Sequence, residues 1–272
     1  MRVPPESSYG VLRKAAAESA NDRLLEQMRR QGFAVYDPGF SEDEVGAIAA
    51  RFDALHESYL ARFDATFLQR VNEQHTIRAP LLWPTGDFDR LALHPGLLDV
   101  VDALIEGQFI LNQQNGVINP PGERYNQGAW HRDFPYQHFV SNTPLGVNAL
   151  YCVDELTREN GATWVIPSSH RFGEFPSETY VAEHARQVEA PAGSFILLDC
   201  MLYHSGGANV SDRPRRAVNH VFNIPFFKQQ INLTKHLQAD RFSDREQGVL
   251  GFRYAEPADI ESYLASRPER ND

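Results

Sequence analysis

The sequence predicts a mainly β fold, a sandwich or barrel with α-helices on one side. Amphipathic helical patterns dominate up to about residue 107, and short apolar segments separated by turn residues follow. Helices followed by a run of strands are typical of folds in which helices cover one face of a β-structure. No linker or repeat divides the 272 residues. We therefore expect one domain over 1–272, with a helical flank at about 11–107 and a β core at about 108–230.

Capping signals and apolar spacing predict the helices of the flank. Asn21 is the expected cap of a helix over 21–31, and Ser41 with Glu44 forms a capping box for the next helix. Apolar residues then recur at helical spacing: Leu24, Leu25 and Met28, then Val45, Ile48, Ala49, Phe52 and Leu55, then Leu97, Val101 and Leu104. Between the first two helices, GFAVYDPGF (32–40) reads as a short strand between turn residues.

The β core is predicted from apolar segments bounded by Gly, Pro, Asn and Asp. These segments lie near 109–118, 145–153, 162–166, 194–203 and 216–224. Alternate residues of a strand share a face. In three of these segments, polar residues share a face with apolar residues. They are Asn112 and Gln114 in the first segment, Asn148 in the second and Asn219 in the last. Either these side chains face water on a one-sided sheet, or they line a polar pocket inside a barrel.

Composition limits the classes of binding partner and the cellular compartment that we expect for this protein. The chain carries 26 Lys and Arg against 36 Asp and Glu, a formal charge of −10. This acidity argues against nucleic acid and anionic membrane surfaces as partners and leaves a small molecule. Two cysteines exclude a disulfide scaffold and favour a reducing compartment. The opening MRVPPESSYG has no apolar segment typical of a signal peptide, so we expect a cytoplasmic protein, as monomer or homodimer.

Ten histidines direct attention to metal-ligand spacing. His131 and Asp133 stand at i and i+2, which on a strand aims both side chains to one side. His204 ends an apolar strand at a Gly-rich turn, and Arg215 follows 11 residues later. Each residue alone is more typical of a salt bridge, a core histidine or a solvated cation. Together, two imidazoles and a carboxylate suit a facial Fe(II) site, and an arginine can bind a carboxylate through two hydrogen bonds.

Three functions compete on these residues. The first is an iron oxygenase. The second is a zinc-type metal hydrolase or isomerase on a cupin-like barrel, because the same donors suit zinc. The third is a catalytically silent barrel that binds a ligand. Arg215 favours the first, since a hydrolase has no need to hold a dicarboxylate, and the complete ligand set argues against the third.

The order of these motifs resembles the phytanoyl-CoA dioxygenase family of Fe(II)/2-oxoglutarate oxygenases. Four segments carry the resemblance: GFAVYDPGFSEDEV, NPPGERYNQGAWHRD, ENGATWVIPSSH and HSGGANVSDRPRRA. It extends over about residues 24–250. Ser168 replaces the family's usual Gly. Gly206 stands where many relatives have a Ser that contacts the cosubstrate, so that contact is missing here or is supplied by Ser205 or Thr163.

The resemblance implies a double-stranded β-helix core, the jelly-roll of cupin-like proteins. It also implies that His131, Asp133 and His204 are the catalytic iron ligands and that Arg215 binds the far carboxylate of 2-oxoglutarate. Gln114, Asn148 and Thr163 are further candidates for the cosubstrate pocket. The implied activity uses Fe(II), 2-oxoglutarate and O2 to oxidise a C–H bond of a small polar molecule or natural-product intermediate, releasing succinate and CO2.

Hydroxylation is the first expectation for that oxidation. Asp133 favours it, because a small residue replaces the carboxylate in related halogenases. Desaturation, epimerisation and ring closure stay open. The segment 65–95, with His75, Trp83 and Asp87, is a candidate lid.

Overall fold

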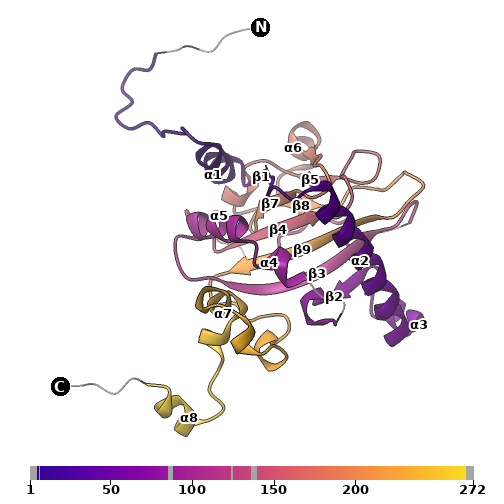
Figure 1. The fold of residues 1–272 in the computed structure, drawn as a ribbon. Helices are drawn as coiled ribbons and strands as arrows, with labels where there is room; N and C mark the ends of the chain where they lie inside the picture. The colour runs from indigo at the N-terminus through magenta and orange to yellow at the C-terminus, as the bar shows by residue number, and fades with distance from the viewer. Residues whose placement is uncertain (1–4, 6, 85–87, 124, 136–139, 268–272) are drawn as a thin grey trace, which may run out of the picture.

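The computed structural model describes residues 5, 7–84, 88–123, 125–135 and 140–267 and contains two antiparallel β-sheets (Figure 1). The strands of the larger sheet are β1 (Phe33–Tyr36), β2 (Thr76–Arg78), β3 (Ile110–Asn119), β4 (Gly146–Cys152), β7 (Phe195–Asp199) and β9 (Arg215–Asn223). Their spatial order is β1-β7-β4-β9-β3-β2. The smaller sheet has the order β6-β5-β8, from β5 (Thr163–Val165), β6 (Arg186–Val188) and β8 (His204–Ser205).

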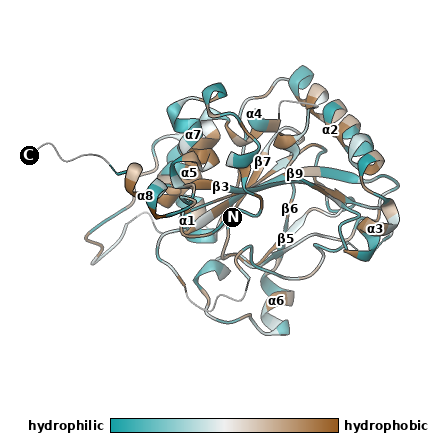
Figure 2. Cartoon of the chain, turned by 90° about the horizontal axis from the view of Figure 1, so that it is seen from below, coloured by the Kyte–Doolittle hydropathy of each residue, from teal (hydrophilic) through white to brown (hydrophobic). Residues whose placement is uncertain are grey.

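Helices cover one face of the larger sheet, and the smaller sheet lies on the other side. The α-helices of the described residues, whichever side they lie on, are α1 (Ala20–Gln31), α2 (Glu42–Arg62), α3 (Ala65–Arg70), α4 (Phe88–Ala92), α5 (Pro95–Ile105), α6 (Glu178–His184), α7 (Asp244–Leu250) and α8 (Ile260–Ala265). Figure 2 shows α2, α4, α5 and α7 on the side of the larger sheet that faces away from β5 and β6. A mainly β fold with flanking helices is therefore confirmed.

Local signals account for the ends of the main helices. The capping box of Ser41 and Glu44 starts α2 as expected. Helix α1 instead starts at Ser19, whose hydroxyl accepts from the amide of Asp22, so the expected cap at Asn21 is wrong. Gly32 ends this helix at a φ of 80°, a left-handed conformation that glycine adopts without steric cost.

Two apolar layers hold the sheets in place. Between the helices and the larger sheet, Phe52 and Leu104 pack with Tyr151, Phe195 and Phe222 of the sheet. Between the sheets, residues of the opposite strand faces form a second cluster: Val117, Leu150, Ile196, Leu198 and Ala217 with Val165 and Val188. Complete burial of one such large side chain contributes about 1.5–3 kcal/mol, so both faces of the larger sheet are strongly determined.

The expected strand over 194–203 ends early and turns. Strand β7 stops at Asp199, whose Oδ1 accepts from the amide of Met201 and whose carbonyl accepts from Leu202. After this turn β8 joins the smaller sheet, with His204 paired to Val165 of β5. The turn therefore moves the chain from one sheet to the other and delivers His204 to the space between them.

The larger sheet extends into the predicted helical flank. Both of its edge strands, β1 and β2, come from that region. Strand β2 was not predicted and belongs to the candidate lid over 65–95, where Trp83 packs against Tyr59 and Phe63; Asp87 lies outside the described residues. Within the described ranges, no helix is long and apolar enough to cross a membrane.

Candidate metal centre

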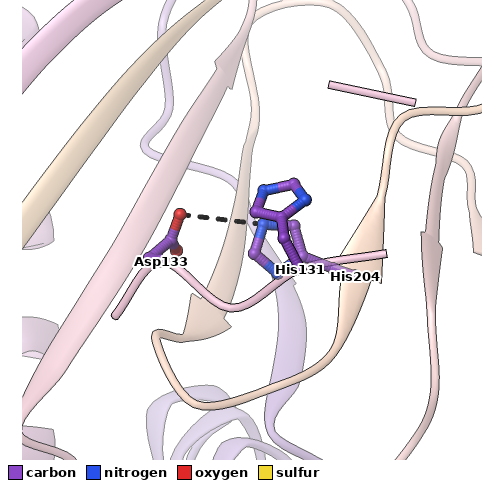
Figure 3. Close-up of side chains that lie close together, drawn as sticks. All are labelled: His131, Asp133 and His204. Atoms are coloured by element: carbon purple, nitrogen blue, oxygen red, sulfur yellow. Dashed lines mark ion pairs between the residues drawn. The ribbon is translucent and has the colours of Figure 1, made fainter. Parts of the chain in front are cut away.

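The side chains of His131, Asp133 and His204 converge, as Figure 3 shows. Each offers one donor atom, and these atoms lie within 4.8 Å of one another. His204 Nε2 is 3.8 Å from Asp133 Oδ1, and the two imidazole ring centres are 4.3 Å apart. In the part of the chain that the structure describes, this is the one group of three or more His, Cys, Asp or Glu residues with such spacing.

Backbone pairing brings the two histidines together. His131 and His204 exchange both of their main-chain hydrogen bonds, each N–H donating to the other's carbonyl at 3.0 Å. The amide of Asp133 donates to the carbonyl of Cys200 at 3.1 Å. The strand expected for the HxD motif is reduced to this single bridge, because the chain turns after Asp133. The expected convergence of the two side chains is nevertheless observed.

Backbone carbonyls set the orientation of both imidazoles. Nδ1 of His131 lies 2.8 Å from the carbonyl of Ala129, and Nδ1 of His204 lies 2.9 Å from that of Leu202. A carbonyl oxygen can only accept, so each Nδ1 carries the proton and each Nε2 is left with a lone pair. Both rings thus have the tautomer that a metal ligand needs: Nδ1 is hydrogen-bonded to a backbone carbonyl, and Nε2 is available to a metal.

The carboxylate is held in a similar way. Asn148 of β4 donates from Nδ2 to Oδ2 of Asp133 at 3.0 Å, and the other oxygen is the one that faces His204. Burial lowers the pKa of His204, and the neighbouring carboxylate offsets this only in part. The imidazole is therefore neutral near pH 7, as metal binding requires. Two imidazoles and one carboxylate are a donor set that suits Fe(II) or zinc.

These three side chains line a cavity of about 360 Å³. Its lining includes Val117, Tyr125, Leu150, Thr163, Gly206 and Arg215. The lining also includes Thr76, Arg78, Gln113, Asn115, Asn219 and Gln230. The cavity is thus built from both sheets and from the segments that join them.

Arg215 is a buried cation without a matching anion. Its side chain is 2% exposed, Nη2 donates to the carbonyl of Gly161 at 3.1 Å, and Nε has no partner. Among the described residues, no carboxylate lies within ion-pairing distance of it. An unpaired buried charge is costly, so a guanidinium that faces a cavity is poised for an anionic ligand.

The comparison with protein families settles the class of protein. The family model described as phytanoyl-CoA dioxygenase (PhyH) matches residues 28–217. The chain belongs to the phytanoyl-CoA dioxygenase family. This confirms the resemblance drawn from the motifs and the expected assignment to the dioxygenases, a class of oxidoreductase.

Curated relatives of this family member cover most of both chains. The uncharacterized protein Rv1501 of Mycobacterium tuberculosis is 32% identical over 229 residues, which are 82% of this chain and 83% of that protein. The ectoine dioxygenase of Sphingopyxis alaskensis is 27% identical over 226 residues, 71% of this chain and 72% of that enzyme.

Solved structures agree on the fold of the family member. EctD from S. alaskensis, crystallised with 2-oxoglutarate and 5-hydroxyectoine, has a TM-score of 0.62 at 26% identity, covering 81% of this chain and 80% of that one. The epimerase SnoN of nogalamycin biosynthesis has a TM-score of 0.57 at 20% identity and covers 75% and 80%. The expected jelly-roll core is confirmed, with antiparallel sheets that, among the residues the structure describes, do not close into a barrel.

The secondary residues expected around the cosubstrate fall into two groups. Asn148 and Thr163 line the cavity, and both are buried. Ser205 does not belong to the cavity wall, and its hydroxyl donates to the carbonyl of Gly206. Of the two replacements considered for the missing Ser contact, Thr163 is the one that lies in the cavity.

The expected place of Gln114 in the pocket is wrong. Its side chain is buried on the helix-covered face of β3, where Nε2 donates to the carbonyl of Phe88 at 2.6 Å and Oε1 accepts from Leu81. Nε2 also lies 2.9 Å from Nε2 of His220, whose Nδ1 is bound to the carbonyl of Ala149. The alternation from Gln114 to Ile118 was predicted correctly, but a bulge between Leu111 and Gln113 takes Asn112 out of it. Alternation also does not say which face the helices cover.

Several residues that line the cavity were not predicted as site residues. Arg78, Asn115 and Asn219 stand in one row across β2, β3 and β9, because Asn115 is paired with both of the others. Asn219 was noted in the sequence analysis, whereas Arg78 lies on the unpredicted β2 and Asn115 was not considered. Tyr125 sits in the segment NPPGERYNQG, and only its position before the HxD motif could have drawn attention to it.

Proposed function

We propose that this protein is an Fe(II)- and 2-oxoglutarate-dependent dioxygenase that oxidises a C–H bond of a small polar molecule. His131, Asp133 and His204 hold the iron, and Arg215 binds the far carboxylate of 2-oxoglutarate. The observation that carries the proposal is that one cavity contains both the three oriented donor groups and the buried, unpaired Arg215. The EctD structures with bound Fe and with 2-oxoglutarate, at 26% identity, support the same cofactors.

The protein's residues prepare the site for these cofactors. The carbonyls of Ala129 and Leu202 keep both imidazoles in the required tautomer, and Asn148 holds one oxygen of Asp133. Arg215 supplies charge and hydrogen-bond donors in a desolvated place, where an ionic hydrogen bond is strong. Iron and 2-oxoglutarate, when bound, supply the oxidising chemistry, in which O2 is consumed and 2-oxoglutarate becomes succinate and CO2.

The cavity wall favours a substrate that forms hydrogen bonds and carries little charge. Arg78 is bound at Nε and Nη2 by the carboxylate of Glu73, so this pair has no net charge. Its Nη1 contacts Gln230, and the buried Oδ1 of Asn219 has no partner. We infer a small molecule with hydroxyl or amide groups, hydroxylated at a C–H bond. We also propose that the chain acts as one domain, because the wall includes residues from Thr76 to Gln230.

Anaerobic addition of Fe(II) and 2-oxoglutarate tests this function. A visible charge-transfer absorption that requires both components is expected, since a 2-oxo acid bound to Fe(II) at this site absorbs in the visible range. The zinc and silent-barrel alternatives predict no such band. Arg215→Ala is expected to raise the 2-oxoglutarate concentration needed for half-maximal absorption by about 100-fold, the effect of losing a charged hydrogen-bonded partner. Oxygen-dependent succinate release then serves to screen candidate substrates.

A further inference from the structure

Tyr125 lines the cavity, and the family resemblance assigns it no role. It lies in the segment between β3 and His131, and its carbonyl accepts from the amide of Gly128. The neighbouring Gln127 accepts from the amide of Gly206 at 2.8 Å, which ties this segment to the residues after His204. The position of Tyr125 is therefore set by backbone hydrogen bonds close to the three donor groups.

The ring of Tyr125 packs directly on Gly206. A Cβ atom added to Gly206 would lie 2.6 Å from Cε1 and 2.8 Å from Cδ1 of the ring. Such distances are far below van der Waals contact, so no larger residue fits at 206 while Tyr125 keeps this place. The aromatic side chain thus occupies the volume that a side chain at position 206 would take, in a cavity whose lining also includes Thr163 and Arg215.

The hydroxyl group of Tyr125 has no hydrogen-bond partner within the described residues, and the residue is half-buried in the lining of the cavity. Burial raises the pKa of this phenol, and the positive charge of Arg215 opposes the rise only in part. The group is therefore a neutral O–H donor near pH 7. A buried tyrosine hydroxyl usually finds an acceptor, and here an acceptor can come from a ligand in the cavity.

We infer that Tyr125 helps to select the cosubstrate: its hydroxyl donates a hydrogen bond to the far carboxylate of 2-oxoglutarate, the group that Arg215 binds. This inference rests on the proposed function. It follows from the presence of Tyr125, Thr163 and Arg215 in one cavity lining, from the exclusion of any side chain at Gly206, and from the buried Nε of Arg215, which has no acceptor.

The chemistry of the ligand explains why two donors are needed. A carboxylate has two oxygens and about four lone-pair sites, more than one guanidinium edge can satisfy. A phenol adds a donor without adding a second buried charge, whose desolvation would be costly. Both donors reach the same end of the ligand, so a 2-oxo acid that lacks the far carboxylate loses both contacts.

Tyr125→Phe is the test, because it removes only the hydroxyl and keeps the ring on Gly206. The protein is loaded with Fe(II) without oxygen and titrated with 2-oxoglutarate, and in parallel with 2-oxopentanoate, which has the same length but no far carboxylate. The charge-transfer absorption gives each Kd. We expect about 10-fold weaker binding of 2-oxoglutarate, the usual effect of losing a hydrogen bond to a charged group, and an unchanged Kd for 2-oxopentanoate.

Tyr151→Phe is the matched control. Its hydroxyl also lacks a partner, but Tyr151 is fully buried against the helices on the opposite face of the sheet. It should leave both Kd values unchanged. Equal 2-oxoglutarate binding by Tyr125→Phe and the unchanged protein overturns the inference. Equal weakening for both acids also overturns it, since that pattern indicates a general disturbance of the site. If the unchanged protein forms no charge-transfer band, the proposed function itself fails.

Discussion

Asn148 donates to Oδ2 of Asp133 at 3.0 Å and so fixes which carboxylate oxygen faces His204. The donor comes from the centre of the larger sheet, whereas Asp133 lies on a turning segment that a single bridge holds in place. The rigid sheet therefore positions a proposed metal ligand on a less regular part of the chain. Partners of this kind commonly affect metal affinity almost as much as the ligands do.

Replacing Asn148 with Ala should weaken Fe(II) binding by about 10- to 100-fold, because Asp133 then loses its orienting donor. Anaerobic titration with Fe(II) measures this. Asn112→Ala is the matched control: its amide also donates one hydrogen bond, to the carbonyl of Lys228, outside the cavity. Equal Fe(II) affinity in the two variants would show that Asp133 does not need Asn148.

Removal of a proposed ligand should have a larger effect. His131→Ala, Asp133→Ala and His204→Ala are each expected to reduce iron-dependent succinate formation by more than about 100-fold, beyond what loss of an outer partner does. His184→Ala and Asp212→Ala, both on the exposed surface, serve as controls. Succinate formation by Asp133→Ala at the rate of the unchanged protein would falsify the metal assignment.

Gln114 should matter for stability and not for cosubstrate binding. Gln114→Leu leaves the amide of Leu81 and the carbonyl of Phe88 without their buried partner, at a cost of about 2 kcal/mol in the free energy of unfolding. Urea unfolding measures this cost. The Kd of 2-oxoglutarate should stay the same. Weaker binding of 2-oxoglutarate would indicate that Gln114 contributes to the cosubstrate pocket after all. Gln113→Leu on the cavity face is the control and should change stability little.

His220 should make the fold sensitive to acid. Burial lowers the pKa of this histidine to about 4, below its ordinary value of 6.5, so the unfolded chain takes up its proton first. The contribution of neutral His220 to the free energy of unfolding is therefore complete above about pH 6.5 and decreases as the pH drops toward 4. The total decrease is on the order of 3 kcal/mol.

Urea unfolding at pH 7.5 and 4.5 compares the unchanged protein with His220→Gln, whose side chain has no such titration. The variant should lose less stability on acidification. Asp199, whose pKa burial raises to about 6, titrates in both proteins and cancels in the comparison. The exposed His184→Gln should keep the full pH dependence, and an equally steep loss in His220→Gln would contradict the assignment.

Local interactions explain what could be predicted. The capping box at Ser41, the apolar spacing of the main helices and the alternation along β3, β4 and β9 act over a few residues, so they can be read along the chain. The ligand candidates could be found because HxD, a distant His and an Arg have a recognisable order. The HxD segment did not need a regular strand, since one bridge to His204 is enough to align it.

The sequence by itself determined the mainly β fold and the family, and it supplied the prediction of four principal site residues. Only the tertiary structure decided which strand faces meet the cavity: Gln114 turned out to support the helices, and its neighbours Gln113 and Asn115 line the wall. The same holds for Tyr125 against Gly206 and for Arg78 on an unpredicted edge strand. The physical reason is that local periodicity fixes which residues share a face, whereas burial of that face depends on packing between segments distant in the chain.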